Sequence, residues 1–249
     1  MIQIAFQPVS SLTELQRDAC QALAETALPL AESTDMADYL HERFQSYPFI
    51  LHAQDDMGLA AFQLIDAFPD IGEHFYYMGP LFSRRRAYLP MFLEYFRSTW
   101  QKHSHETFHM LAELQNPDLL LTFKTLFRRT SYPALDALKA PAPVQKTAQI
   151  YANRLAHITH FQPSSLSSHH AETLYRPGSG PEAVISWLHA RGIEPEKGGS
   201  QMLLLSCPPC TEARSAIDHD LKRGLLMLRH WSRFRPFMLK KFKEALPVG

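Results

Sequence analysis

One stretch near the middle of the chain, from His74 to Trp100, restricts the fold more than any other. It begins with an aromatic, β-prone run from Phe75 to Phe82 and then passes through a turn that holds three consecutive arginines. A helix follows, with Pro90 in its first turn, where a missing backbone N–H costs least. Its apolar residues recur at helical spacing and need a sheet to cover them: Leu89, Phe92, Leu93, Phe96 and Trp100. The stretch therefore predicts a strand–turn–helix unit in an α/β layer.

The turn of this unit is a candidate anion site. Ser83 and the three arginines Arg84, Arg85 and Arg86 lie directly before the predicted helix. Backbone N–H groups, the positive end of a helix dipole and guanidinium groups would meet there, and a phosphate group fits such a place. A solvated turn is the alternative interpretation.

The segments on either side predict the rest of a sheet. A strand from Ile2 to Val9 precedes a helix that opens with a capping-box pattern at residues 11–14 and a short helix at residues 35–45. Residues 48–54 and 59–68 are predicted to form a hairpin, residues 106–114 another strand, and Asp118 opens a helix. This order predicts a mixed, mostly antiparallel α/β sheet with helices on its faces.

After residue 140 the chain changes character. Residues 144–161 predict a helix, 162–180 a loop, 181–191 a short helix and 200–206 a buried strand, and the remainder is helical to about Leu246 with a break near Pro236. We therefore expect a core at residues 1–140 and a mainly helical C-terminal extension at residues 141–249 whose one strand, 200–206, would complete the sheet.

With this element order, residues 2–132 resemble the GNAT acyltransferase superfamily. Leu81 and Phe82 stand where the fourth strand of that family carries its bulge, and Ser83 to Leu89 where its acyl-CoA pyrophosphate loop lies. Arg84, Ala87 and Leu89 take the places of the Arg or Gln, the Gly and the Gly or Ala that the loop usually has. The run from Glu113 to Asn116 matches the end of the fifth strand.

The resemblance implies a V-shaped opening between the fourth and fifth strands, next to which acetyl-CoA or another acyl-CoA would bind as co-substrate. The pantetheine arm would lie along the fourth strand like an added strand, and the pyrophosphate would rest on amides of the loop. The binding residues implied in this way are Gly79, Leu81, Phe82, Ser83, Arg84, Arg85, Arg86, Ala87, Tyr88, Leu89 and Asn116. The extension would help to form the acceptor pocket.

The resemblance also implies an enzyme, an N-acyltransferase in which an amine or hydroxyl of a small molecule or peptide attacks the thioester. Tyr77 occupies the approximate place of the family's general base, Glu113 is a usable carboxylate, and Tyr132 can donate a proton. These three are the candidate catalytic residues, and each has a packing role as its alternative. Backbone N–H groups near Leu81 to Ser83 would hold the oxyanion. A second hypothesis is a GNAT-like binding or regulatory module without catalysis.

The sequence Cys207-Pro208-Pro209-Cys210 supports a third hypothesis, a dithiol redox protein. A strand, a CxxC motif and then a helix is the order that lowers a thiol pKa, although a thioredoxin-like fold needs further strands. Zinc would need four ligands, and neither the cysteines with nearby histidines nor the pair His157 and His160 forms a regular set. We therefore predict no metal site and favour a structural role for the cysteines.

Charge and hydropathy restrict the kinds of partner and the cellular location that we expect. With 25 basic and 25 acidic residues, the chain has no net charge that would favour nucleic acid. Residues 221–246 are strongly basic and interleaved with aromatics, so they either pack on the body or contact an acyl-carrier protein or a membrane surface. No secretory signal and no run of about 18 apolar residues is visible, so we expect a cytoplasmic protein. The oligomeric state is not predicted.

Overall fold

The computed structural model describes residues 2–27, 35–84, 87–170 and 180–247. They form two compact units, one made of the residues up to Phe108 and the other of the residues from His109 on. Both units consist of strands, mostly antiparallel, with helices packed around them. The predicted fold class, a mixed and mostly antiparallel α/β sheet flanked by helices, is confirmed. No helix within these ranges is long and apolar enough to cross a membrane.

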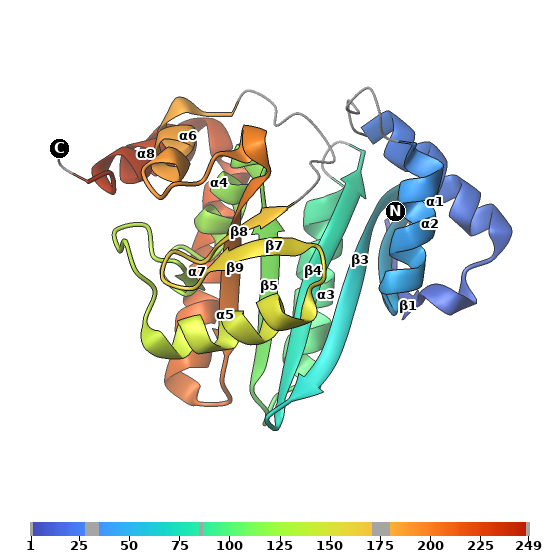
Figure 1. Ribbon diagram of the computed structural model, residues 1–249, viewed down its shortest axis with the longest axis horizontal. Coiled ribbons are helices and arrows are strands. Elements are labelled where there is room, and N and C mark those ends of the chain that lie inside the picture. The colour runs from blue at the N-terminus through green and yellow to red at the C-terminus, as the bar shows by residue number, and fades with distance from the viewer. Residues whose placement is uncertain (1, 28–34, 85–86, 171–179, 248–249) are drawn as a thin grey trace. The chain divides into compact units, whose positions relative to one another are not determined.

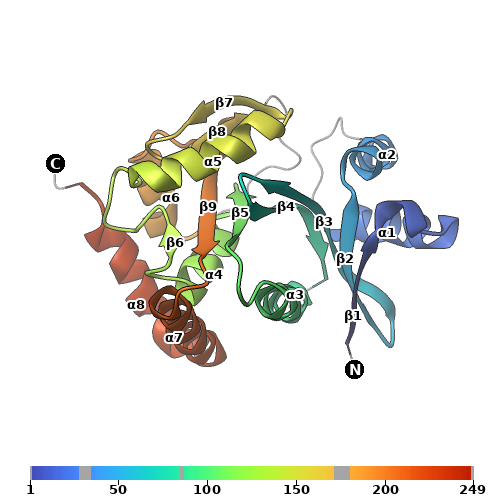
Figure 2. The same cartoon turned by 90° about the horizontal axis from the view of Figure 1, so that it is seen from below.

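The first unit contains a four-stranded antiparallel arrangement in the order β1-β2-β3-β4. Its helix α3 lies on one face of these strands and α1 and α2 on the other (Figure 2). The elements are β1 Gln3–Pro8, a 3-10 turn Val9–Ser11, α1 Glu14–Ala27, α2 Met36–Ser46, β2 Phe49–Asp55, β3 Gly58–Asp70, β4 Glu73–Ser83 and α3 Tyr88–Lys102.

The strand–turn–helix unit predicted from residues 74–100 is present as β4 and α3. The helix buries a stripe one position away from the predicted one, formed by Met91, Phe92, Tyr95, Phe96 and Thr99. This stripe packs against β1, β2 and β3, because residues three and four apart share one face of a helix. Inside the unit, Phe62 of β3 and Phe82 of β4 stack with ring centroids 4.9 Å apart.

The second unit is arranged around β9, whose residues are buried except for Ser206. Its strand order is β5-β9-β8-β7, and β6 pairs with β9. Helix α5 lies in front of β9 and α7 behind it (Figure 1). The elements are β5 Phe108–Leu114, α4 Pro117–Leu126, β6 Ser131–Tyr132, α5 Ala142–Arg154, β7 Ile158–Gln162, β8 Ser167–His170, α6 Glu182–His189, a 3-10 turn Pro195–Lys197, β9 Gly199–Cys207, α7 Thr211–Arg229 and α8 Trp231–Glu244.

Two expectations for the extension differ from the structure. Besides the predicted strand at residues 200–206, which is β9, the extension contains β7 and β8, an antiparallel hairpin in a segment predicted as helix end and loop. The C-terminal helices are separated at His230, and Pro236 lies inside α8. The compact units divide at Phe108–His109, and α4 packs on α6 and α7; the expected core at residues 1–140 and extension at residues 141–249 remain a prediction.

Candidate functional site

The turn between β4 and α3 and the strand end before it were predicted to bind the acyl donor. In β4 the pairing with β3 is regular from Glu73 to Met78 and again from Leu81 to Ser83, but the register shifts between these two parts. Gly79 and Pro80 together face a single residue of β3, Leu64. This is a β-bulge, and it lies two residues before the position that the resemblance implies.

Gly79 has a specific neighbour at this bulge. A Cβ atom added to Gly79 would lie 2.4 Å from a ring carbon of Tyr47, so the aromatic ring occupies the space that a side chain would need. The Gly79 carbonyl accepts a hydrogen bond from Gln63 Nε2 at 3.1 Å. The backbone of the bulge is therefore fixed by two side chains of its own unit.

Arg84 is held on the β2–β3 hairpin. Its Nη2 donates to Asp55 Oδ1 at 3.0 Å and to the Gly58 carbonyl at 3.2 Å, while its backbone N–H donates to the Ala60 carbonyl at 2.8 Å. The guanidinium thus anchors the turn, and the phosphate contact that we predicted for it remains a prediction. Arg85 and Arg86 lie outside the described residues.

The N-terminus of α3 carries the positive end of the helix dipole. Its N-cap residue is Ala87, which has no side chain that could accept from the first N–H groups, and the first turn contains no acidic residue. Tyr88, Leu89 and Met91 carry amide N–H groups in that turn, whereas Pro90 has none. Such an end of a 15-residue helix favours an anion by its dipole.

Glu113 of β5 lies in a hydrogen-bonded group that the sequence did not reveal. Its Oε2 is 2.7 Å from His157 Nε2, and its Oε1 accepts from the hydroxyl of Ser168. The Glu113 side chain is only 4% exposed and that of His157 18%. A buried carboxylate that is paired with an imidazole can take up a proton or orient the imidazole that does so.

The other two candidate catalytic residues occupy packed positions. Tyr77 of β4 is buried, and its ring lies against Tyr47 with centroids 6.2 Å apart. Tyr132 belongs to β6, where it pairs with Leu204 of β9. Their catalytic roles remain predictions.

Asn116 acts as the N-cap of α4. Its Oδ1 accepts from the backbone N–H groups of Asp118, at 2.9 Å, and Leu119, at 3.3 Å. This local role accounts for an asparagine at the end of β5 without any ligand, and its predicted part in cofactor binding remains a prediction.

The two cysteines of the CxxC motif have different surroundings. Cys207 at the end of β9 is buried, and burial raises the pKa of its thiol, with a small opposing effect from Arg214. Cys210 is exposed at the N-cap of α7, and both thiols are free. A raised pKa at Cys207 is the reverse of what a reactive dithiol needs.

A second polar group that the sequence analysis missed joins His74, His103 and Glu106 at the start of β4 and the end of α3. Like the contact between Glu113 and His157, it links residues that are distant in the sequence. The periodicity of each segment carries no signal for either group.

Comparisons with known proteins were made for the whole chain. The sequence matches no protein-family model, and no curated protein matches it significantly. Among solved structures, the ribosomal-protein-S18-alanine N-acetyltransferase from Escherichia coli is 14% identical, with a TM-score of 0.35, and the match covers 51% of this chain and 76% of that one.

Two further solved structures are similar to this chain. A protein of the GNAT family from Desulfovibrio desulfuricans is 11% identical, with a TM-score of 0.35, over 84% of this chain and all of that one. A chain of the NatC complex bound to Gag peptide and CoA is 16% identical, with a TM-score of 0.32, over 49% of this chain and 82% of that one. At such scores the likeness carries no weight for function.

Proposed function

We propose that the protein is an acyltransferase, which moves an acyl group from acetyl-CoA or another acyl-CoA, or from a carrier thioester, to an amine or hydroxyl of a small molecule or peptide. The observation that carries this proposal is the unit formed by β4 and α3. Its strand has a bulge at Gly79 and Pro80, and its helix begins without a side-chain cap or an acid.

The two parts of this unit that flank its turn suit two parts of an acyl-CoA molecule, the pantetheine arm and the pyrophosphate. The bulge shifts the register of β4 against β3, and the pantetheine arm would hydrogen-bond to the β4 backbone in this region like an added strand. The amides at the start of α3 suit the pyrophosphate. Arg84, through its contact with Asp55 at 3.0 Å, supports the turn that joins them.

The reaction itself needs a proton acceptor. The acceptor nitrogen forms a bond to the thioester carbonyl carbon, the carbon–sulfur bond breaks, and its electron pair leaves with the sulfur. The nitrogen loses a proton, and we propose the carboxylate of Glu113, which is hydrogen-bonded to His157, as the group that takes it up. The same proton can then neutralise the thiolate of the departing CoA.

Binding of the donor is tested at Pro90, an exposed residue in the first turn of α3. Pro90→Glu places a negative charge where the pyrophosphate would lie, while the same charge stabilises the helix through its dipole. We expect the affinity for CoA and acetyl-CoA, measured by calorimetry, to fall at least tenfold without a loss of thermal stability. Pro90→Gln is the neutral control and should bind nearly as the wild type does. Equal affinities for all three proteins would contradict the site.

Turnover is tested by release of the CoA thiol from acetyl-CoA and longer acyl-CoAs in the presence of a panel of amines, peptides and alcohols. We expect Glu113→Gln to lower kcat by roughly 100-fold or more, the size of a general acid–base effect, and to leave CoA binding intact. Ser168→Ala removes one hydrogen bond of Glu113 but keeps its charge, so it should lower kcat far less. CoA binding without turnover of any donor would favour the alternative of a non-catalytic binding module.

A further inference from the structure

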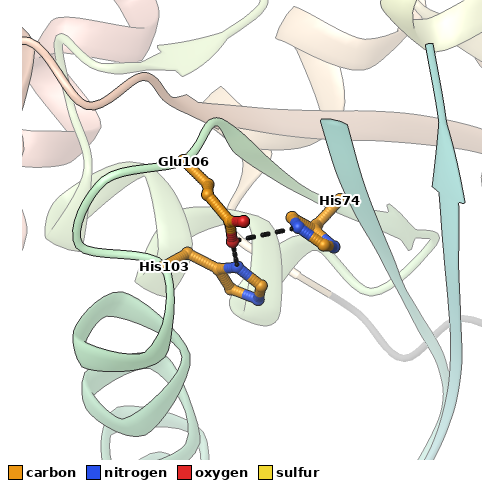
Figure 3. Close-up of side chains that lie close together, drawn as sticks. All are labelled: His74, His103 and Glu106. Carbon is orange, nitrogen blue, oxygen red and sulfur yellow. Dashed lines mark hydrogen bonds and ion pairs between the residues drawn. The ribbon is translucent and has the colours of Figure 1, made fainter. Parts of the chain in front are cut away.

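The beginning of β4 and the end of α3 bring three polar side chains together, far from the proposed donor site. His74 is the second residue of β4, His103 is the C-cap of α3, and Glu106 lies in the loop that follows (Figure 3). Along β4, His74 and Ser83 are separated by roughly 30 Å, at about 3.3 Å per residue. The group is therefore distinct from the turn before α3.

The potential ligand atoms of the three side chains converge. Glu106 Oε2 is 2.8 Å from His103 Nδ1 and 3.1 Å from His74 Nε2. All three ligand atoms lie within 4.8 Å of one another, and the two imidazole rings have centroids 4.1 Å apart. Figure 3 shows both rings directed toward the same carboxylate. Two basic rings and one carboxylate thus share a single small volume.

The backbone holds these side chains in place. The N–H of His74 donates to the carbonyl of Thr107 at 3.1 Å, which ties the start of β4 to the loop that carries Glu106. The N–H of His103 donates to the carbonyl of Thr99 at 3.0 Å and so continues the last turn of α3. All three residues belong to the first unit, and two of them, His74 and His103, lie at ends of elements with a buried face, so little ordering would be required on binding.

His103 also has the outer contact that metal-binding histidines usually have. Its Nε2 is 2.6 Å from the hydroxyl oxygen of Tyr76, a buried residue of β4. With the ring proton on Nε2 and donated to Tyr76, the lone pair of Nδ1 points toward Glu106. A hydrogen bond of this kind fixes the tautomer and the orientation of a ligating imidazole.

We propose that His74, His103 and Glu106 form a binding site for a divalent transition-metal ion, with Zn²⁺ as the reference ion. Two imidazole nitrogens and one carboxylate oxygen are a ligand set that Zn²⁺ accepts in proteins, with Zn–N and Zn–O distances of about 2.0–2.2 Å. Mg²⁺ and Ca²⁺ prefer oxygen ligands and do not suit it. The metal ion binds without release of a proton to solvent when each neutral imidazole carries its ring proton on the nitrogen that does not face the ion.

The required movement is small. Ligand atoms around tetrahedral zinc lie about 3.3 Å apart, given these bond lengths, so Glu106 Oε2 must withdraw by about half an ångström from His103 Nδ1 and by less from His74 Nε2. Glu106 can do so because its side chain is 55% exposed, whereas His103 is 2% exposed and fixed. His74 is 34% exposed, so the fourth position faces solvent and suits a water molecule. The bound ion would clip the start of β4 to the end of α3.

The test uses protein without a polyhistidine tag, since the chain itself has 13 histidines. Zn²⁺ binding is measured by calorimetry, and Co²⁺ binding by the visible absorption that tetrahedral coordination produces. We expect one ion per chain and an increase of the melting temperature on addition of Zn²⁺. His74→Ala and Glu106→Gln change partly exposed side chains, so both variants should fold and lose at least tenfold in affinity.

Two further variants make the test specific. His105→Ala changes an exposed histidine between the proposed ligands in sequence and should bind as the wild type does. Tyr76→Phe removes the outer hydrogen bond and keeps the ring, and it should weaken binding by about 10- to 100-fold. Absence of 1:1 binding, or binding that is unchanged in His74→Ala and Glu106→Gln, overturns the proposal. A loss in His105→Ala equal to that in His74→Ala overturns it as well.

Discussion

Lys124 of α4 is a fully buried ammonium group surrounded by oxygen acceptors. Its Nζ donates to the Ser131 carbonyl, the Ser131 hydroxyl and the Pro133 carbonyl, each at 2.9 Å. The Ser131 hydroxyl in turn donates to the carbonyl of Phe127 at 2.6 Å. The lysine thus joins α4 to the segment that contains β6, at the cost of a charge taken out of water.

Burial lowers the pKa of Lys124 from 10.5 to about 7, partly opposed by the charge of Asp220. Between these two values the unfolded chain binds a proton that the folded chain does not, so the free energy of unfolding rises with pH. We expect it to rise relative to that of Lys124→Met, by up to about 1.4 kcal/mol per pH unit. Urea unfolding of both proteins from about pH 7 to 10 measures the difference. Parallel curves would show that the three acceptors keep the ammonium charged throughout.

Gly79 is a second residue whose environment predicts a defined effect. Gly79→Ala would place a methyl group 2.4 Å from the ring of Tyr47, and we expect a loss of about 1–3 kcal/mol in the free energy of unfolding from overpacking. The cost should fall when the same change is made in a Tyr47→Ala background, because residues in contact are coupled in a double-mutant cycle. Denaturant unfolding of the four proteins gives the coupling. Additive effects would mean that the ring moves aside freely.

At the scale of elements, α4 and α7 cross at very short distance. A Cβ atom on Gly224 of α7 would lie 2.4 Å from Leu126 Cα and 2.6 Å from the carbonyl oxygen of Thr125. Near this crossing, Asp220 of α7 accepts hydrogen bonds from the backbone N–H groups of Arg129 and Thr130 at 2.6 and 3.0 Å. The close approach of two backbones therefore depends on one glycine.

We expect Gly224→Ala to destabilise the protein by about 1–3 kcal/mol. The sign of this change in the free energy of unfolding is informative, because alanine is intrinsically favoured over glycine inside a helix by about 1 kcal/mol. Ser215→Ala, at an exposed position of the same helix, is the control and should be neutral or slightly stabilising. Thermal or denaturant unfolding measures both. A stabilising Gly224→Ala would show that α7 can move away from α4 without cost.

Elements with a strong hydrophobic pattern were predictable from the sequence, and elements with a weak hydrophobic pattern were not. The hairpin predicted at residues 48–54 and 59–68 is β2 and β3, and the apolar run at 200–206 is β9, because alternation or continuous burial determines these strands. The hairpin of β7 and β8 was missed. Three of the five β7 residues are exposed, and β8 reads Ser-Ser-His-His, so neither strand has a hydrophobic signal.

The candidate sites, too, were predictable only where a local sequence signal marks them. The resemblance implied a bulge at Leu81 and Phe82, and the structure has it two residues earlier, at Gly79 and Pro80, two residue types that often mark an interruption of a strand. The contact of Glu113 with His157 joins residues 44 positions apart, and that of Tyr76 with His103 joins residues 27 apart. With 13 histidines in the chain, the sequence offers no reason to choose these partners.

At the scale of the whole molecule, the division into units follows contacts that span the C-terminal half. His109 Nδ1 lies 2.9 Å from the hydroxyl of Ser206, 97 positions later, and the hydroxyl of Tyr151 donates to the carbonyl of His109 at 3.0 Å. These contacts assign β5 to the second unit. A boundary drawn from composition alone places it later, because the Pro- and Ala-rich segment after Tyr132 resembles a linker although it lies within one unit.

The chain contains three cysteines, and the structure predicts a different reactivity for each. Burial raises the pKa of Cys20 to about 12 and also raises that of Cys207, while Cys210 is exposed. Because the thiolate is the reactive form, we expect the native protein to react quickly with a thiol reagent at one position only, Cys210. All three should react in denaturant. Cys210→Ser should remove the fast reaction and leave the two slow ones.

The number of reactive thiols in unreduced protein distinguishes three free cysteines from the disulfide that the redox hypothesis requires. If Cys207 and Cys210 remain separate thiols, as in the structure, denatured and unreduced protein gives three reactive groups. A disulfide between them would give one group under the same conditions and three only after reduction. A fast reaction of two thiols in the native state would likewise contradict the burial of Cys207, because β9 would then have to open at its end to expose the thiol. Either result would return the CxxC motif to a chemical role.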